Sequence, residues 1–310
     1  MGSQASTAGC AGDTPDGSRA TDACRPNGRG GARGKYDNVD GDLPGAAEYL
    51  RAARTDVPAQ AVDAFPDTCI MHVNIQGLRS HLAELSAVIR LSASTPDIVC
   101  INETFLDYGV EEIDLEGFDV VGRRDRSYNG DKRRCGGVIV YAKSEIADHV
   151  TLLQVSEVSE RLWFQLHTNN GPYLLCAWYR PPVQGEVQTI ESFEAELGQL
   201  RGNALGMMLL GDINLHSKRW LSHSASSDME GELMRHLCLK MGLRQIVRGP
   251  TRGNHLLDLC ITDIESATAS VSEKTADHAI VTSRLNLGIP QTVGHRWKVW
   301  SYLKADWDIL

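Results

Sequence analysis

Short apolar runs that each end in polar residues recur along this chain from Phe65 onward, and they constrain its fold more than any other feature. Three of them are residues 69–74, 97–103 and 208–216. Helical patterns lie between them, and this alternation is typical of a layered α/β protein. Such proteins build their sites at the carboxyl ends of strands. The polar residues that end these runs are therefore candidate site residues: Asn74, Glu103, Asp212 and Asn214.

The run at 208–216 suggests chemistry most directly. Gly211 allows a turn, and Asp212 and Asn214 follow two residues apart, which places both side chains on one side of an extended backbone. The carboxylate can take a proton from water or hold a cation, while the amide orients a phosphate or the attacking water without adding negative charge. On this stretch alone, a strand that ends in an Asp/Asn turn explains the residues at least equally well.

Other patterns predict helices and a hairpin between these runs. The apolar residues of 82–89 and of 193–200 recur at helical spacing. Ser227-x-x-Glu230 fits a capping box at the start of a further helix, which Gly242 ends. Asn169-Asn170-Gly171 joins two strand-like runs and predicts a hairpin.

Composition narrows the class of protein. At 310 residues, with 42% hydrophobic and 23% charged residues, the chain can bury a substantial core in one large domain or two. The eight cysteines include no Cys-x-x-Cys pair, which argues against a zinc cluster or disulfide framework and favours reduced thiols in an intracellular protein. No apolar run reaches about 18 residues, so we expect no membrane span. The net charge of −9 counts against a general nucleic-acid binder, but not against one with a basic patch.

The two ends of the chain differ from its middle. The first 42 residues contain nine glycines and, among Leu, Ile, Val and Phe, only Val39, which is too little apolar surface to offset the entropy of ordering. We therefore expect residues 1–64 to form a disordered, Gly-rich arm, residues 65–290 to form the folded domain, and residues 291–310 to be a linker.

Basic residues are concentrated locally despite the negative net charge. Residues 123–143 hold seven Lys and Arg against two Asp, and this segment lies between two predicted strands. A charge run is usually a solvated face, but in an otherwise acidic domain it favours contact with a phosphate backbone. The candidate DNA contacts are basic or aromatic residues from this segment, from the strand end at 179–182 and from two later loops: Arg124, Arg133, Arg134, Arg180, Arg219, Trp220 and Arg252.

Tyr179 and Arg180 lie where a predicted strand ends, directly before two prolines stop the sheet. A phenolic hydroxyl and a guanidinium in that place suit an anion. The alternative is a tyrosine at a strand edge beside a surface arginine, and the sequence leaves both open.

Asp258 lies inside the buried run 256–262, and a carboxylate there requires a partner because burying a lone charge is costly. Asp277 and His278 come just before another predicted strand and offer such a partner. A lone histidine before a strand would usually be structural. An Asp-His pair with a second, buried aspartate to orient the imidazole is a recurring catalytic arrangement.

Seven motifs, taken in order, resemble the endonuclease/exonuclease/phosphatase superfamily, which includes apurinic endonucleases. They extend over about Thr68 to Leu287 and are Asn74-x-x-Gly77-Leu78-Arg79, Asn102-Glu103-Thr104, Gly136-Gly137-Val138, Tyr179-Arg180-Pro181-Pro182, Gly211-Asp212-Ile213-Asn214, Leu257-Asp258-Leu259 and Asp277-His278. Within the superfamily the chain most resembles the apurinic-type endonuclease domain of non-LTR (LINE-type) retrotransposon polyproteins. In those domains Gly-Asp-x-Asn-x-His followed by Trp, Tyr-Arg-Pro-Pro, and Pro-Thr-Arg before a Leu-Asp-Leu strand occur together, as they do here.

The resemblance implies a four-layer α/β sandwich, in which two packed mixed β-sheets are flanked by helices. It also implies Mg²⁺ as cofactor, with Mn²⁺ as the alternative ion, near three residues with oxygen ligands: Glu103, Asn74 and Asp277. Asp212 would orient and deprotonate the attacking water. The remaining catalytic roles would be to bind the scissile phosphate, for Asn214 and Tyr179, and to stabilise charge on the pentacovalent phosphate, for His278 held by Asp258.

One position departs from the pattern. Repair-type relatives have an aspartate two residues after the asparagine, where this chain has Gln76. A neutral amide removes one negative charge from the metal site, which would weaken metal affinity and argues against apurinic-site repair.

The resemblance thus implies a metal-dependent DNA endonuclease that nicks one strand by hydrolysis and leaves a 3′-hydroxyl to prime reverse transcription at the target site. The sequence leaves two alternatives: a superfamily phosphatase or phospholipase, and a decayed fragment that binds nucleic acid without catalysis. The ending Ala305-Asp306-Trp307 resembles the start of a linker to a reverse transcriptase, so we expect such a domain in a longer polyprotein. The expected location is intracellular, in the nucleus.

Overall fold

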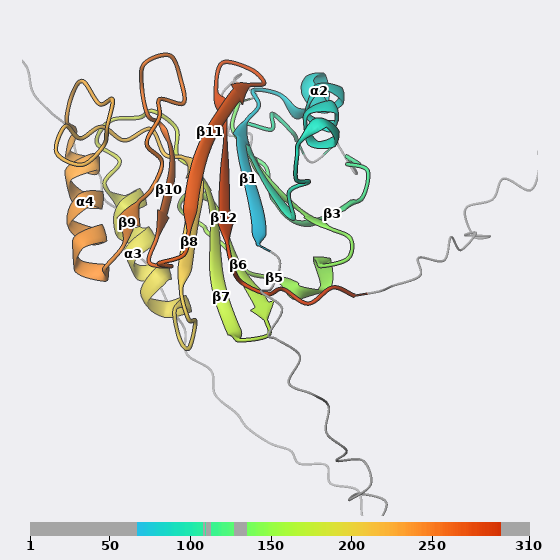
Figure 1. Ribbon diagram of the computed structural model, residues 1–310. Helices are drawn as coiled ribbons and strands as arrows, with labels where there is room; N and C mark the ends of the chain where they lie inside the picture. Colours follow the sequence, from blue (N-terminus) through green and yellow to red (C-terminus); the bar gives the residue numbers. More distant parts are fainter. Residues whose placement is uncertain (1–66, 108, 110–112, 127–134, 293–310) are drawn as a thin grey trace, which may run out of the picture. The chain divides into compact units, whose positions relative to one another are not determined.

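The computed structural model describes residues 67–107, 109, 113–126 and 135–292. These residues belong to one compact unit within 61–310, and they form two six-stranded β-sheets with helices outside them (Figure 1). The predicted arm, residues 1–64, lies outside the described residues, as do residues 293–310 of the predicted linker.

The first sheet has the strand order β11-β12-β1-β2-β4-β3. In that order, the strands are Thr268–Lys274, Ala279–Leu285, Thr68–Asn74, Ile98–Asn102, Val138–Lys143 and Phe118–Arg124. β1 and β2 are parallel, and all other neighbours are antiparallel. The parallel pair matters for the site, because Asn74 and Asn102 lie side by side where both strands end.

The second sheet has the strand order β5-β6-β7-β8-β10-β9. Its strands are Val150–Val155, Glu160–Thr168, Gly171–Tyr179, Met207–Asp212, Asp258–Thr262 and Arg244–Gln245. Thr168 pairs with Gly171, which confirms the predicted hairpin. β8 and β10 are antiparallel, and their register places Asp212 directly opposite Asp258.

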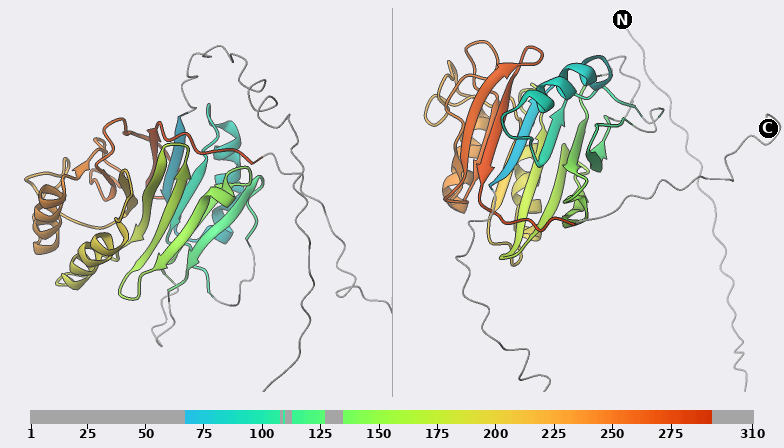
Figure 2. Two further views of the ribbon diagram at one scale, coloured as in Figure 1. Left: turned by 90° about the horizontal axis from the view of Figure 1, so that it is seen from below. Right: turned by 45° about the vertical axis from the view of Figure 1, so that its right-hand side comes forward.

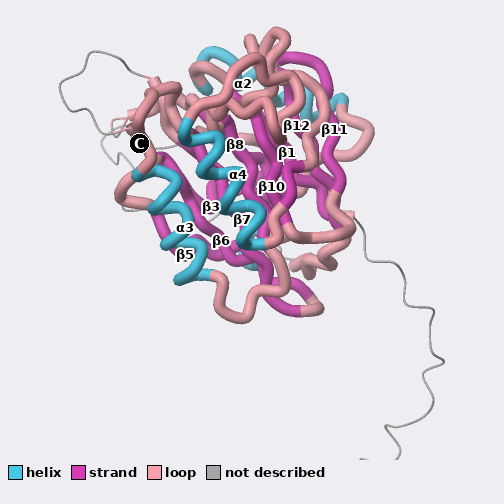
Figure 3. The backbone as a smooth tube through the Cα atoms, turned by 90° about the vertical axis from the view of Figure 1, so that its left-hand side faces the viewer, coloured by secondary structure: helices cyan, strands magenta, loops and turns pink. Residues whose placement is uncertain are grey.

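Helices cover the outer face of each sheet. α2 (Leu78–Leu91) packs Leu78, Leu85 and Ile89 on the first sheet. α3 (Gln188–Leu200) and α4 (Met229–Met241) lie side by side on the second, on the opposite side of the molecule from α2 (Figures 1 and 3). A short 3₁₀ helix, η1 (Ala147–His149), leads into β5. The predicted four-layer sandwich is confirmed, and Figure 2 shows the two sheets packed together.

The start of α4 corrects one prediction. Asp228, and not Ser227, is the N-cap, and its side chain accepts a hydrogen bond from the backbone N–H of Gly231. Gly242 ends the helix in the left-handed conformation, as predicted. Asp and Ser are equally good N-caps, so composition alone could not choose between the two neighbours.

Alternation along β1 explains why polar residues lie between two apolar sheets. Val73 faces α2, whereas His72 and Asn74 point toward the second sheet and hydrogen-bond with residues of β10 and β8. On the facing strand β8, Gly211 is required by close packing, since a Cβ there would lie 1.7 Å from the carbonyl oxygen of Trp178. β7 and β8 therefore approach each other closely within the second sheet just before the carboxylate of Asp212.

Candidate active site

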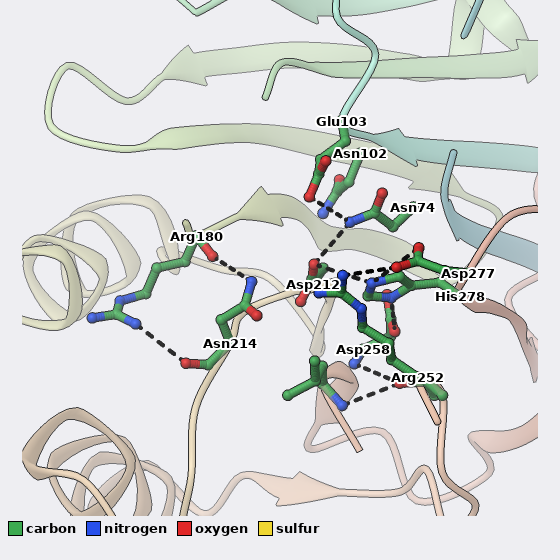
Figure 4. A network of polar contacts seen from close by, with 12 residues as sticks. Asn74, Asn102, Glu103, Arg180, Asp212, Asn214, Arg252, Asp258, Asp277 and His278 are labelled. Atoms are coloured by element: carbon green, nitrogen blue, oxygen red, sulfur yellow. Dashed lines mark hydrogen bonds and ion pairs between the residues drawn. The ribbon is translucent and has the colours of Figure 1, made fainter. Parts of the chain in front are cut away.

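Strand ends from both sheets meet at one end of the sandwich, and polar side chains converge there (Figure 4). Asn74 ends β1 and connects two carboxylates. Its Nδ2 atom donates to Oδ2 of Asp212 at 2.8 Å and to Oε1 of Glu103 at 3.0 Å. The amide of Asn74 thus links the end of β8 with the turn after β2.

Glu103 lies in a strained turn that the backbone holds in place. Its φ of 53° is in the left-handed region, which is uncommon for a residue other than glycine and is concentrated at functional sites. The carbonyl oxygen of Glu103 accepts a hydrogen bond from the N–H of Gly77 at 2.8 Å. The turns after β1 and β2 therefore fix each other, and the hydrogen bond from Asn74 holds the Glu103 carboxylate that projects from them.

Asp258 carries a histidine on each of its oxygens. Nδ1 of His278 lies 2.7 Å from Oδ2, and Nε2 of His72 lies 2.9 Å from Oδ1; all three side chains are fully buried. The hydroxyl of Thr251 accepts hydrogen bonds from the backbone N–H groups of Leu257 and Asp258 at 3.1 Å, which anchors the start of β10. This arrangement supplies the partner that a carboxylate buried in a strand requires.

The surroundings favour an ionised Asp258 and a protonated His278. Burial acts to raise the pKa of Asp258, but hydrogen bonds from His278 and His72 outweigh it and bring that pKa below its ordinary value. Burial acts to lower the pKa of His278, but the hydrogen bond and charge of Asp258, with the charge of Asp212, raise it. The pair is therefore held as carboxylate and imidazolium.

Asp212 has the opposite tendency. Burial, followed by the negative charge of Asp258, raises the pKa of Asp212 to about 8, with Glu103 acting in the same direction and His278 and Asn74 against it. A carboxyl group with a pKa in this range is well suited to exchange a proton near neutral pH. Nε2 of His278 lies 4.0 Å from Oδ2 of Asp212, so a cation and a base face each other across the site.

The residues around Asn74 fit a divalent cation. Oδ1 of Asn74 and Oδ1 of Asp212 are buried and have no hydrogen-bond partner among the described residues. With the Asn74 amide turned so that Oδ1 instead of Nδ2 faces the two carboxylates, these oxygens and the Glu103 carboxylate would form a set of hard donors of the kind that Mg²⁺ prefers. Asp212, Asp258 and His278 also lie close enough to share an ion, but both oxygens of Asp258 and Nδ1 of His278 are already engaged in hydrogen bonds. We therefore favour an ion site beside Glu103 and Asn74 over one between Asp258 and His278.

Asp277 lies at the rim, on the His278 side of the site. Its Oδ2 atom forms an ion pair with Arg252 at 2.7 Å, and its Oδ1 atom lies 3.8 Å from Nε2 of His278. The structure thus brings Asp277 to the imidazole, while its predicted part in the metal site stays a prediction.

The comparisons with known proteins agree on the fold. No protein-family model matches the chain, and no curated protein matches it either. Among solved structures, the endonuclease domain of TRAS1, a telomere-specific non-LTR retrotransposon, is similar with a TM-score of 0.53 and 17% identity over 72% of this chain and 99% of that one. AP endonuclease LMAP from Leishmania major is similar with a TM-score of 0.56 and 15% identity over 78% of this chain and 99% of that one. The catalytic domain of Xenopus laevis APE2 has a TM-score of 0.53 and 13% identity over 74% and 94%.

The chain has the endonuclease/exonuclease/phosphatase fold. The fold places β1, β2, β8 and β10 as the strands whose ends carry the site, and these four strands supply or directly precede Asn74, Glu103, Asp212 and Asp258. Among the described residues, the helices are all too short or too polar to cross a membrane.

Tyr179 lies at the end of β7 in this fold and borders the carboxylates. Burial, the charges of Glu103 and Asp212 and a hydrogen bond to Glu103 raise the pKa of its hydroxyl, so the phenol stays protonated. The guanidinium of Arg126 lies 5.6 Å from the centre of the Tyr179 ring and is held there by Glu160. Tyr179 is thus a hydrogen-bond donor beside the carboxylates, as its predicted role requires.

The predicted DNA contact of Arg180 is wrong. Its side chain is buried: Nε donates to the hydroxyl of Thr189 at 2.9 Å, and Nη2 pairs with Oε1 of Glu230 at 3.2 Å. The backbone carbonyl of Arg180 also accepts a hydrogen bond from Nδ2 of Asn214 at 2.9 Å (Figure 4). Arg180 therefore holds Asn214, and not a phosphate, at this point of the fold.

Asn214 follows β8 with a φ of 47°, a left-handed conformation like that of Glu103. Its bond to Arg180 uses one of its two amide hydrogens and turns the side chain away from the carboxylate of Asp212 (Figure 4). Asn214 is only two residues from Asp212 in sequence, but the two side chains do not contact each other. The role of Asn214 in binding phosphate stays a prediction.

The other predicted DNA contacts have different surroundings. Arg219 is exposed and lies 3.7 Å from Glu232, while Nε1 of Trp220 donates to the carbonyl of Gly231 and its ring packs against the core. Arg124 ends β3, where Nη2 donates to the carbonyl of Glu157. Arg133 and Arg134 lie outside the described residues.

Sequence reasoning missed two residues of the site. His72 is part of a run that we predicted as a buried strand, and its place two residues before Asn74 was the signal that it shares the same face. Glu160 accepts hydrogen bonds from Arg126 and from the N–H of Gly137, and so ties the basic segment to the site. No local pattern marks Glu160, because its partners are distant in sequence.

Proposed function

We propose that this protein is a metal-dependent nuclease that hydrolyses a phosphodiester in DNA. One observation carries the proposal: the Asp212 carboxylate lies between His278, at 4.0 Å, and the amide of Asn74, which also holds Glu103. A base, a cation and a set of oxygen ligands thus converge on one point, and phosphate ester hydrolysis needs all three.

The reaction can be followed through the chain's own groups. Asp212 takes the proton of the attacking water as the new oxygen–phosphorus bond forms. His278 directs its Nε2–H toward a phosphate oxygen, where negative charge grows, and Asp258 keeps the imidazole charged and oriented. Tyr179 would turn its O–H from Glu103 to donate a hydrogen bond to the same phosphate. The bond from phosphorus to the 3′ oxygen breaks, and that oxygen takes a proton from solvent water and remains as a 3′-hydroxyl, while Asp212 returns its own proton to solvent.

A divalent cation would be held by Glu103 and Asn74, with Asp212 beside it, and when bound it would neutralise charge on the phosphate. Glu103 fits this role because its turn is fixed by the backbone before any ion binds. Mg²⁺ suits such oxygen ligands, and Mn²⁺ would serve in its place.

DNA is the proposed substrate. The similar structures include an AP endonuclease and the endonuclease domain of a telomere-specific non-LTR retrotransposon, and these names support a DNA strand as the target. Arg252, which lies at the rim beside Asp277, and Arg219, in the loop that precedes α4, carry exposed guanidinium groups that suit a phosphate backbone. A nick that leaves a 3′-hydroxyl would serve to prime reverse transcription, with a reverse transcriptase as partner in the nucleus.

A direct comparison of substrates tests this proposal. The protein, with Mg²⁺ present, is given a duplex with intact strands, the same duplex with a terminal 3′-phosphate, and a small phosphomonoester. We expect internal cleavage of the first, with ends that a DNA polymerase extends directly. Release of inorganic phosphate from the monoesters without internal cleavage would contradict the proposal and favour a phosphatase.

A further inference from the structure

His72, the second histidine bonded to Asp258, takes no part in the chemical steps proposed above. His72 comes from β1 of the first sheet, whereas Asp258 begins β10 of the second, and the two are 186 residues apart in sequence. Both side chains have no exposed surface. The hydrogen bond at 2.9 Å between Nε2 of His72 and Oδ1 of Asp258 therefore joins the two sheets directly beneath the site.

The Asp258 carboxylate determines which ring nitrogens of His72 and His278 carry protons. An ionised carboxylate only accepts, so both imidazoles must donate to Asp258: His72 from Nε2 and His278 from Nδ1. Nδ1 of His72 is buried without a hydrogen-bond partner among the described residues, so the bond to Asp258 is the one polar contact found there for its ring. His278 is left with Nε2 facing Asp212.

A carboxylate bound through one oxygen can rotate about its last torsion, which is broad for an aspartate. His72 removes this freedom because it holds Oδ1 while His278 takes Oδ2. We propose that His72 is a positioning residue, which orients the carboxylate of Asp258 and through it the imidazole of His278. This proposal rests on the proposed nuclease function.

The alternative is a purely structural role, in which His72 is a buried histidine whose hydrogen-bonding requirement is met by Asp258. On that view, His72 contributes to folding stability alone, and replacing it would leave His278 and the chemical step as they are. The two views differ in what happens to the rate and to the His278 ring, and both can be measured.

The kinetic test compares three substitutions in the full chain. Glutamine places an amide nitrogen about where Nε2 of His72 lies, asparagine is one bond shorter, and leucine has no donor. We expect His72→Leu and His72→Asn to lower kcat for plasmid nicking by about 10- to 100-fold, as is typical when a supporting hydrogen bond is lost, with KM for DNA within about twofold. His72→Gln should recover most of the rate.

Ser283→Ala is the matched control. Ser283 is fully buried between the same two sheets and donates to Sγ of Cys260 at 3.3 Å, away from Asp258. Its loss should lower the unfolding midpoint without lowering kcat. If the His72 variants behaved like Ser283→Ala, or if His72→Gln were no better than His72→Leu, the positioning role would be overturned.

Imidazole NMR gives a readout that needs no activity. In the wild type, we expect His72 to carry its proton on Nε2, and the Nδ1 proton of His278 to resonate far downfield and exchange slowly with water. In His72→Leu that proton should shift upfield and exchange faster. An unchanged His278 signal would contradict the proposal. An inactive wild-type protein would contradict the nuclease function instead, and the NMR comparison would still decide the role of His72.

Discussion

Oδ2 of Asp212 lies 4.0 Å from Nε2 of His278 and accepts a hydrogen bond from Asn74 at 2.8 Å. The first distance is too long for a hydrogen bond, so the Nε2–H of His278 stays available to a phosphate. It is short enough for each charge to affect the other, since the charge of Asp212 raises the pKa of His278 while His278 opposes the rise in the pKa of Asp212. Base and cation therefore act as one coupled unit.

Asp212 and Glu103 should be separable by metal dependence. Asp212→Asn removes the base, so nicking should fall by about 10²- to 10⁴-fold at every Mg²⁺ concentration. Glu103→Gln should mainly raise the Mg²⁺ concentration needed for half-maximal rate, because it removes one charged ligand and leaves the base. Nicking rates measured against Mg²⁺ concentration check both. Near-normal nicking by Asp212→Asn would show that another group is the base.

Asp212 should also destabilise the folded protein. Its pKa is raised to about 8 by burial and by Asp258, so above pH ~4 the unfolded chain is ionised while the folded protein keeps the proton. Stability is therefore lost as pH rises, by up to ~1.4 kcal/mol per pH unit, until the folded pKa is reached. Asp212→Asn lacks this loss. In EDTA, its gain in unfolding midpoint over the wild type should grow from pH 5 to pH 8, and a gain that is constant with pH would contradict the assignment.

Asp258→Asn should move the whole pH profile of nicking. After burial, the charge of Asp258 is the largest cause that raises the pKa of Asp212. The hydrogen bond and the charge of Asp258 also raise the pKa of His278. Neutralising it lowers both values, so the acid limb, where Asp212 ionises, and the alkaline limb, where His278 loses its proton, should both move to lower pH. The rate should fall by about 10- to 100-fold. A profile that is lower but not displaced would leave Asp258 with a structural role alone.

Arg252 and Arg180 form a matched pair for DNA binding and folding. The Arg252 side chain is 45% exposed and its ion pair with Asp277 stabilises little, so Arg252→Ala should leave the unfolding midpoint almost unchanged. It should reduce the slope of DNA affinity against salt by about one. Arg180→Met leaves Glu230 buried without its cation and should cost about 3–5 kcal/mol of stability, with the salt slope unchanged. A change in salt slope for Arg180→Met, with a loss of stability for Arg252→Ala, would instead make Arg180 the DNA contact and Arg252 the structural residue.

The sequence predicted the buried strands better than the edge strands. The predicted strands at 69–74, 208–210 and 256–262 correspond to β1, β8 and β10, which are central in their sheets, where both faces are covered and apolar runs are continuous. β5, β9 and β11 were not predicted, and all three lie at or next to solvent as edges of a sheet. In β11, exposed and half-buried residues alternate only from Thr268 to Val271 and the residues after them are all exposed, so its pattern is too polar to stand out.

Much of the site was predicted from motifs, but its contacts were not. The pair of Asp258 and His278 was expected and is present at 2.7 Å. His72 was missed because its partner lies on the other sheet, and only the packing of the two sheets brings them together. Arg180 was expected at the surface because two prolines follow it, but the chain near Val183 and the helix carrying Glu230 fold over its guanidinium. Tertiary contacts of this kind have no local signature.

Supercoiled-plasmid nicking with and without Mg²⁺ tests the central claim most directly. The account predicts that the wild type converts supercoiled to open-circular DNA with Mg²⁺, that EDTA stops it, that Asp212→Asn and His278→Asn fail at matched stability, and that a DNA polymerase extends the nicks without prior treatment. A folded wild-type protein that leaves the plasmid supercoiled with Mg²⁺ or Mn²⁺, or nicks it equally well in EDTA, would contradict the account.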